Sequence, residues 1–229
     1  MNELTLIIPA KKEAESLPIF LNEIRNINCH KMIVLQKEDI ETKNVLKNFQ
    51  DIEILEQVNN GYGNALIEGI NNSKTKFSCI INADGSMDPK YLEEMKNCCD
   101  DYDLVFGSRY QKPEGGSEDD DIVTLIGNYF FTYLGNILFS LRISDILYTY
   151  ILGKTSSLKK LELKNSDFRI CVELPIKSKL LELKYICLPS YERKRIGGKK
   201  KVNALKDGLL ILIEIVKYFL GIKNKHSEI

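Results

Sequence analysis

The strongest constraint on the fold is a repeated alternation of apolar runs and amphipathic segments in the first half of the chain. The apolar runs occupy residues 4–10, 31–36, 52–57, 77–84 and 103–110. Segments with the apolar spacing of helices lie between them, at residues 15–27, 40–50, 59–73 and 89–99. Near-continuous apolar strands that alternate with helices form a parallel sheet with both faces covered. The sequence therefore predicts an α/β fold with a mostly parallel central sheet and helices on both faces.

Ligands of such sheets bind beyond the carboxyl ends of the strands. Three polar stretches lie at predicted strand ends, IPAKKE at residues 8–13, INADGS at 81–86 and GSRY at 107–110. Asp84 in the second stretch carries the hard oxygen ligands that suit Mg²⁺ or Mn²⁺. An Asp-Gly turn after a strand is also a common structural feature, so Asp84 alone leaves both interpretations open.

Composition argues against several functions. Lys plus Arg and Asp plus Glu number 32 each, and this balance gives no sign of nucleic-acid binding. The six cysteines lack CxxC spacing and there are two histidines, so no zinc site is expected. The N-terminal residues do not resemble a signal peptide, and we therefore expect a cytoplasmic protein.

The second half contains two long apolar segments, residues 122–141 and 208–222. Polar side chains interrupt both, and these would be costly at a bilayer centre: Asn128, Asn136, Glu214 and Lys217. We expect no spanning helix; core helices or a homodimer interface is one interpretation, and peripheral contact with the inner face of a membrane is the other. The predicted domains are residues 1–206, with an apolar helical insertion at 122–141, and a C-terminal amphipathic helix and tail at 207–229.

Two further stretches could bind phosphate. YERKRIGGKKKV, residues 191–202, places six positive charges around a Gly-Gly pair and could close on phosphates, although a solvated basic turn is the alternative. GYGNAL, residues 61–66, begins a predicted helix whose free N–H groups could face a phosphate.

Five motifs, in this order, resemble those of family 2 glycosyltransferases with the GT-A fold, closest to the dolichol-phosphate mannose synthase branch. IPAKKEAESL is similar to PAYNEAENL, GYGNALIEGI to GKGAALRTGL, NADGSMDP to DADGSHDP, and YERKRIGGKKKV to YRPRIGGESKL, while DLVFGSRY almost repeats the family sequence. The resemblance covers residues 4 to about 212. It implies a GT-A fold with amphipathic C-terminal helices, and inverting transfer of a sugar from a nucleotide-diphosphate sugar with Mg²⁺ or Mn²⁺.

The resemblance also implies site residues. The expected nucleotide-sugar and phosphate ligands are Pro9, Lys11, Glu13, Gln36, Asn82, Ala83, Asp84, Arg109, Arg195 and Lys201. Asp84 and Ser86 would lie at the metal, and Arg109 and Asp145 are the candidate catalytic residues. Glu173 matches a family glutamate.

Three departures from the family pattern affect the donor and metal sites. Gln36 and Lys37 stand where the family's second strand ends in acidic residues, Lys11 and Lys12 replace Tyr-Asn, and Asn82 replaces the first aspartate of the metal motif. These departures imply weaker metal binding, and they leave the identity of the nucleotide base undetermined.

Three functions remain open at this point. The first is transfer to a polyprenyl phosphate, which is already ionised at neutral pH and needs no strong base. The second is transfer to a glycan hydroxyl in surface-polysaccharide synthesis, which requires a carboxylate to take the proton, with Asp145 as the candidate base. The third possibility is a degenerate member that binds nucleotide sugars without turnover.

Overall fold

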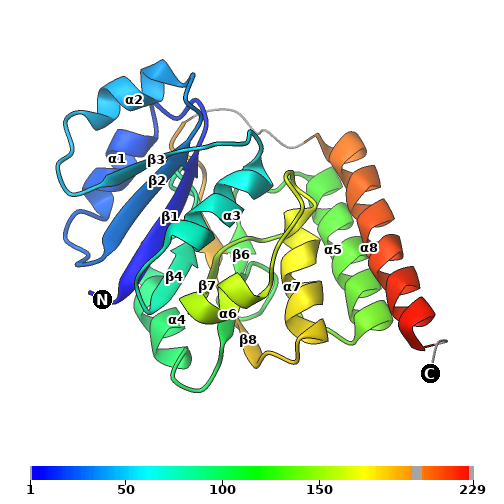
Figure 1. Cartoon of the computed structure of the whole chain (residues 1–229). Coiled ribbons are helices and arrows are strands. Elements are labelled where there is room, and N and C mark those ends of the chain that lie inside the picture. Colours follow the sequence, from blue (N-terminus) through cyan, green and yellow to red (C-terminus); the bar gives the residue numbers. More distant parts are fainter. Residues whose placement is uncertain (1, 198–202, 227–229) are drawn as a thin grey trace.

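The computed structural model describes residues 2–197 and 203–226, and a seven-stranded sheet forms its centre (Figure 1). The strand order is β3-β2-β1-β4-β7-β5-β8. In that order the bounds are Glu53–Glu56, His30–Leu35, Leu4–Ala10, Phe77–Ile80, Ile151–Lys154, Leu104–Ser108 and Tyr185–Pro189. Neighbouring strands are parallel except at β7, which runs antiparallel to β4 and β5. The predicted mostly parallel sheet is confirmed.

Helices cover both faces of the sheet. One face carries α1 (Leu17–Glu23), α2 (Ile40–Leu46), the short 3-10 helix η1 (Pro89–Tyr91) and α4 (Leu92–Cys98). The opposite face carries α3 (Tyr62–Asn72), α5 (Ile122–Phe139), α6 (Thr155–Lys160), α7 (Ile170–Leu180) and α8 (Ala204–His226). A separate pair of short strands, β6 (Gly116–Ser117) and β9 (Tyr191–Glu192), joins two loops.

Strand β1 shows why the apolar runs are continuous. Leu6 and Ile8 pack in the core beneath α1 and α4, whereas Ile7 between them packs in the core beneath α3 and α7. All three side chains are fully buried. Because successive side chains of a strand point to opposite faces, a sheet with two covered faces needs an apolar residue at every position.

Strand β7 and helices α6 and α7 were not predicted from the sequence. Because β7 runs antiparallel to its neighbours, the residues that precede it lie at the same edge as the residues that follow β4 and β5. This reversal brings the segment at residues 145–150 beside the predicted site stretches INADGS and GSRY.

Helix α8 packs against α5 and α7, and its side chains Ile211 and Ile215 belong to the core (Figure 1). The predicted domain boundary after residue 206 falls inside α8, because this helix begins at Ala204. The predicted apolar insertion forms α5. Within the described residues, α5 alone is long and apolar enough to cross a membrane, and one such helix is weak evidence for a span.

Gly69 allows α3 to approach the sheet closely. A Cβ atom at this position would lie 2.4 Å from Ile7 Cγ2 and 3.3 Å from Val34 Cγ2. We expect Gly69→Ala to lower the free energy of unfolding by about 1–3 kcal/mol, because the helix must move away from the sheet. The control is Gly127→Ala in α5, where a Cβ meets nothing within 4 Å and alanine should stabilise the helix by up to about 1 kcal/mol. Urea unfolding measures both variants, and a shift of the same sign and size in the two would contradict this close approach.

Candidate active site

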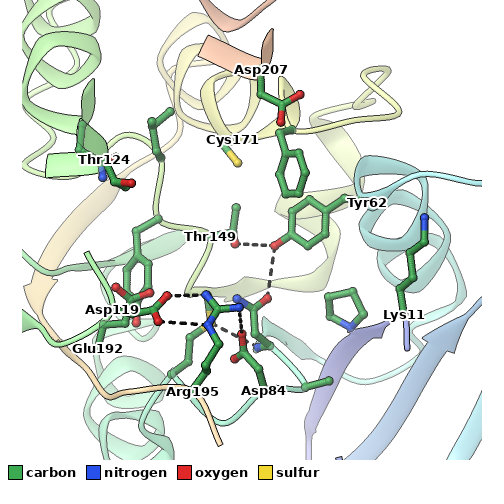
Figure 2. A pocket seen from close by; sticks show the side chains of 18 of the residues that line it. Lys11, Tyr62, Asp84, Asp119, Thr124, Thr149, Cys171, Glu192, Arg195 and Asp207 are labelled. Carbon is green, nitrogen blue, oxygen red and sulfur yellow. Dashed lines mark hydrogen bonds and ion pairs between the residues drawn. The ribbon is translucent and has the colours of Figure 1, made fainter. Parts of the chain in front are cut away.

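A cavity of about 460 Å³ opens at the carboxyl ends of β1 to β5 and extends to the starts of α5 and α8 (Figure 2). Nine of the predicted ligands line it: Pro9, Lys11, Glu13, Gln36, Asn82, Ala83, Asp84, Arg109 and Arg195. The structure therefore brings together residues that are far apart in the sequence, as the strand-end argument predicted. Their roles in binding stay predictions. Lys201 lies outside the described residues.

The loop after β1 holds Lys11 and Glu13 at the cavity wall. Between them Lys12 has a φ of +54°, and its N–H donates to Asp39 Oδ2 at 2.6 Å. Glu13 accepts from Ser16 Oγ at 2.5 Å through Oε2, and its own N–H donates to Thr42. These contacts fix the backbone of the predicted nucleotide-binding loop.

The turn after β4 orients Asp84. The N–H and Oγ of Ser86 donate to Asp84 Oδ1 at 3.1 and 2.8 Å. Ser86 is buried and is not among the residues that line the cavity. We predicted that Ser86 lies at the metal ion. In the structure the Ser86 hydroxyl instead holds the carboxylate of Asp84 in place. Gly85 has a φ of +74°, a backbone conformation that favours glycine. A Cβ there would lie 2.4 Å from Ile196 Cδ1, and Ile196 N donates to Asp84 O at 2.9 Å, so Ile196 packs directly over this turn.

Arg195 lies between two carboxylates (Figure 2). Its Nε donates to Asp119 Oδ1 at 3.1 Å and a terminal nitrogen donates to Asp119 Oδ2, while the other terminal nitrogen is 3.7 Å from Asp84 Oδ2. The hydrogen bonds to Asp119 and the charge of Asp84 raise the pKa of Arg195. The Arg195 guanidinium therefore places a positive charge beside Asp84, the predicted metal ligand.

Arg109 is buried among three carboxylates. Its Nε and one terminal nitrogen donate to Asp145 Oδ2 and Oδ1 at 2.7 and 3.0 Å. The other terminal nitrogen donates to Asp120 at 3.2 Å and Glu192 at 3.1 Å. The ring of Tyr148 lies 4.6 Å from the guanidinium carbon. These contacts use the donor groups that a phosphate would otherwise bind.

The placement of Asp145 differs from that expected of a catalytic base. Both of its oxygens accept from Arg109, its side chain is buried, and it is not among the cavity-lining residues. Because Arg109 occupies both oxygens and the side chain does not line the cavity, neither oxygen is placed to contact an acceptor hydroxyl. The geometry instead makes Asp145 the residue that fixes Arg109. Glu173, the other family carboxylate, accepts from the backbone of Lys164 and Asn165 and lies away from the cavity lining.

Sequence reasoning missed the acidic residues that dominate one side of the cavity. Asp119, Asp120 and Asp121 line it from the segment before α5, and Glu192 lines it from β9. Burial raises the pKa of Glu192, although Arg109 acts in the opposite direction. The available signal was the run of four consecutive acidic residues, 118–121, directly before an apolar helix. Helix capping explains one of them, because Asp121 accepts from Thr124 N at 2.7 Å.

The glycines of GYGNAL have a packing role. Gly61 has a φ of +128°, and Cβ atoms at Gly61 and Gly63 would lie 2.2 and 2.0 Å from the carbonyl oxygens of Ser166 and Asn165. The N–H of Asn64 donates to Ser166 O at 3.3 Å. The start of α3 therefore packs under the loop at residues 165–167, which differs from the open phosphate site expected from the sequence.

Tyr62, between these glycines, reaches Asn82. Its hydroxyl donates to Asn82 Oδ1 at 3.4 Å and lies 2.6 Å from Thr149 Oγ1 (Figure 2). Its ring stacks on Phe168 at 4.9 Å between centroids. Asn82 Oδ1 thus accepts a hydrogen bond from a neutral hydroxyl group. Asp84 is the acidic residue of the Asn-Ala-Asp stretch at residues 82–84.

The described residues contain no group of three or more His, Cys, Asp or Glu side chains that could hold a metal ion. Magnesium is often bound by one or two carboxylates together with water and substrate phosphates. Asp84, a fixed carboxylate at the cavity wall, fits that mode as a single protein ligand.

Solved structures of two sugar-transferring synthases resemble this fold. Glucosyl-3-phosphoglycerate synthase from Mycobacterium tuberculosis matches with a TM-score of 0.73 and 11% identity, over 94% of this chain and 79% of that chain. Mannosyl-3-phosphoglycerate synthase from Rubrobacter xylanophilus matches with a TM-score of 0.68 and 13% identity, over 99% and 75% of the two chains. At such identities the likeness shows the fold alone, and it confirms the predicted GT-A fold.

The sequence comparison is more specific. The family model described as glycosyl transferase family 2 matches residues 5–162, which is more than half of the chain. This range includes β1 to β5 and the loops that hold Lys11, Asp84 and Arg109. The chain belongs to glycosyl transferase family 2, which confirms the predicted enzyme class, a glycosyltransferase.

Proposed function

We propose that this protein transfers a sugar from a nucleotide-diphosphate sugar to an acceptor held at a membrane, with a polyprenyl phosphate as the first candidate acceptor. One observation carries the proposal: a cavity of about 460 Å³ joins the predicted nucleotide ligands to Asp84 and Arg195 and ends between α5 and α8. This volume lies within the range of small-molecule sites. The link to the dolichol-phosphate mannose synthase branch is part of the proposal and rests on the five motifs.

The donor would lie along the strand ends. Lys11, Glu13 and Gln36 would contact its base and ribose, and Asp84 and Arg195 its diphosphate. Structures of the Mycobacterium tuberculosis synthase hold UDP together with Mn²⁺ or Mg²⁺, which supports a divalent ion here. Asp84 would hold this ion with phosphate oxygens and water, and the ion would offset the charge of the departing diphosphate.

Arg195 would exchange partners when the donor binds. In the free protein it is paired with Asp119, and a diphosphate offers it the same bidentate geometry with more negative charge. The acceptor oxygen would attack the anomeric carbon opposite the leaving group, so that the carbon–oxygen bond to the diphosphate breaks with inversion. The electron pair leaves with the diphosphate, whose charge Arg195 stabilises.

The outer sides of α5 and α8 support a membrane-held acceptor. Their exposed apolar side chains are Ile122, Val123, Leu125, Ile126, Tyr129, Phe130, Tyr133 and Ile137 on α5, and Leu205, Leu209, Ile213, Val216 and Leu220 on α8. Most of these residues recur every three or four positions, so they lie on the side of each helix opposite the buried Phe131 of α5 and Ile215 of α8. We call these residues the α5–α8 face. Contiguous apolar surface of this kind marks a membrane or protein contact.

A membrane explains this surface better than a second copy of the chain. Thr124 and Gly127 of α5 and Ala204 and Gly208 of α8 line the cavity. A lipid chain could therefore lie along the α5–α8 face while its head group enters the cavity. On this view the protein is peripheral on the inner face of the membrane.

A glycan hydroxyl is the second candidate acceptor, and the charge of the cavity favours it. The described lining carries seven carboxylates and three basic side chains, and both arginines are already paired. A hydroxyl enters such an environment more easily than a phosphate does. Its proton would pass to a lining carboxylate, and Glu192, whose pKa is raised by burial, is suited to accept it.

Metal-linked donor binding tests the proposed function directly. Titration calorimetry with UDP-, GDP-, ADP- and dTDP-sugars, with and without Mn²⁺, should find a nucleotide sugar that binds wild-type protein more tightly with the ion. Asp84→Asn should weaken the metal-dependent affinity about 10- to 150-fold, the equivalent of about 1.5–3 kcal/mol. The control is Asp88→Asn, because Asp88 caps η1 by accepting from Lys90 N at 3.0 Å and is not among the cavity-lining residues. Unchanged metal-linked affinity in Asp84→Asn would contradict the metal assignment, and no binding of any donor would contradict the function.

The role of Arg195 is tested by kinetics. Arg195→Ala should lower kcat/KM about 30- to 150-fold, since a charge-assisted contact of about 2–3 kcal/mol to the leaving group is lost. Lys194→Ala is the matched control, because Lys194 is exposed, lies next to Arg195 in the chain and is not among the residues that line the cavity. Small losses of the same size in both variants would show that the loop is surface charge.

The α5–α8 face is tested by co-sedimentation with vesicles that contain an anionic phospholipid. Wild-type protein should bind and be released by carbonate, and Phe130→Glu should reduce binding at least about 10-fold. Val58→Glu is the control, since Val58 is 87% exposed in a distant loop. Release by detergent alone would refute a peripheral contact, and a stable dimer without vesicle binding would assign the surface to a second copy.

A further inference from the structure

We infer that the end of the cavity beside α5 binds hydroxyl groups of the transferred sugar, and that Asn128 takes part in selecting that sugar. The inference rests on the proposed use of a nucleotide sugar and extends it to a part of the cavity for which the sequence suggested no ligand.

Asn128 lies on the inner side of α5, where 1% of it is exposed, and it lines the cavity. Its Nδ2 donates to the hydroxyl oxygen of Tyr110 at 2.9 Å. That hydroxyl donates its single proton to Asp120 Oδ2, so it can only accept from Asn128. These two contacts fix the orientation of the amide, with the N–H group toward Tyr110 and the carbonyl oxygen Oδ1 directed elsewhere.

The Oδ1 atom has no hydrogen-bond donor among the groups of the protein that the structure describes. Buried polar atoms without a partner are rare in folded proteins and call for an explanation. The neighbouring inward position, Phe131, is apolar, and an apolar side chain at 128 would avoid an unpaired acceptor. Because Asn128 borders a cavity, a hydroxyl group of a bound ligand can provide the missing donor.

The neighbours of Asn128 define the chemistry of that ligand. Asp120 and Asp121 line the same end of the cavity, and Asp207 lines it from α8. Ionised carboxylates and the fixed amide oxygen only accept hydrogen bonds. Arg109, the cation beside them, is already bound by three carboxylates. A ligand group with several hydrogen-bond donors fits this end, and sugar hydroxyls have that character.

The order of groups along the cavity assigns these hydroxyls to the transferred sugar. In Figure 2, Lys11 and Thr124 lie on opposite sides of the cavity, and Asp84 and Arg195 lie between them. With the base near Lys11 and the diphosphate at Asp84, the sugar beyond the diphosphate extends toward α5. Asn128 and Asp120 are then within the part of the cavity that this sugar enters.

The test compares each nucleotide with its sugar derivative. Titrations use UDP, GDP, ADP and dTDP and their glucose, galactose and mannose derivatives, with Mn²⁺. For the donor that binds, Asn128→Leu should leave the affinity for the parent nucleotide unchanged. The additional affinity that the sugar provides should fall about 5- to 30-fold, since one hydrogen bond to a buried acceptor is lost. Asn128→Ser, which cannot overpack the core, repeats the test in case the leucine variant does not fold.

Asn136→Leu is the control on the same helix. Asn136 uses both atoms of its amide with the backbone of Ile143, at 2.7 and 2.9 Å. Its replacement should lower stability and leave the sugar-dependent affinity unchanged.

Three results would overturn the inference. One is an unchanged sugar-dependent affinity in the folded Asn128 variants, and this result leaves the proposed function intact. Another is an equal loss for nucleotide and nucleotide sugar, which would place Asn128 at the nucleotide. The third is unchanged donor affinity with slower transfer to added methyl glycosides, which would assign the hydroxyl site to the acceptor. Failure of every nucleotide and nucleotide sugar to bind would remove the proposed function and the inference together.

Discussion

The ion pairs of the buried Arg109 connect three parts of the chain that are far apart in the sequence. Its guanidinium binds Asp120 before α5, Asp145 before β7 and Glu192 in β9. Removing one member of a buried charge network leaves another charge without a partner, at a cost of about 3–5 kcal/mol. The wall of the cavity opposite Lys11 and Gln36 is therefore built around one cation. The same contacts explain why Arg109, although it lines the cavity, has little capacity left for a ligand.

Antiparallel β7 makes this network possible. Its position between β4 and β5 brings the residues before it to the carboxyl edge of the other strands. Asp145 and Thr149 reach the site by this route and meet Arg109 and Tyr62. The result is a cavity with one side formed by parallel strands, where we propose that the nucleotide binds, and an acidic side formed by loops and helix starts. Such a division suits a ligand with a charged centre and an uncharged, hydroxyl-rich end.

Helix α5 borders the polar cavity on one side and forms an exposed apolar surface on the other. Its inner side carries Asn128 at the cavity, and its outer side carries the exposed Ile126, Phe130 and Tyr133. Helical periodicity separates these two sets of side chains by half a turn, so a single helix can border a polar cavity and present an apolar surface. If the α5–α8 face meets a membrane, the starts of both helices bring the cavity close to the lipid head groups. The proposed acceptor and the proposed sugar site then lie at the same end of the molecule.

Sequence by itself determined the layered α/β fold, because continuous apolar strands such as residues 4–10 are stable only between two layers of helices. It also determined which edge carries the site, since Lys11, Asp84 and Arg109 all follow parallel strands. The partners of these side chains were not predictable, because they depend on contacts between distant segments. Only the tertiary structure decided that Asp145 fixes Arg109, that Asp119 holds Arg195, and that Asn128 keeps an oxygen beside the cavity without a partner among the described residues. The physical reason is that apolar periodicity is encoded locally, whereas the protonation and hydrogen bonding of a buried polar group depend on whatever the fold places next to it.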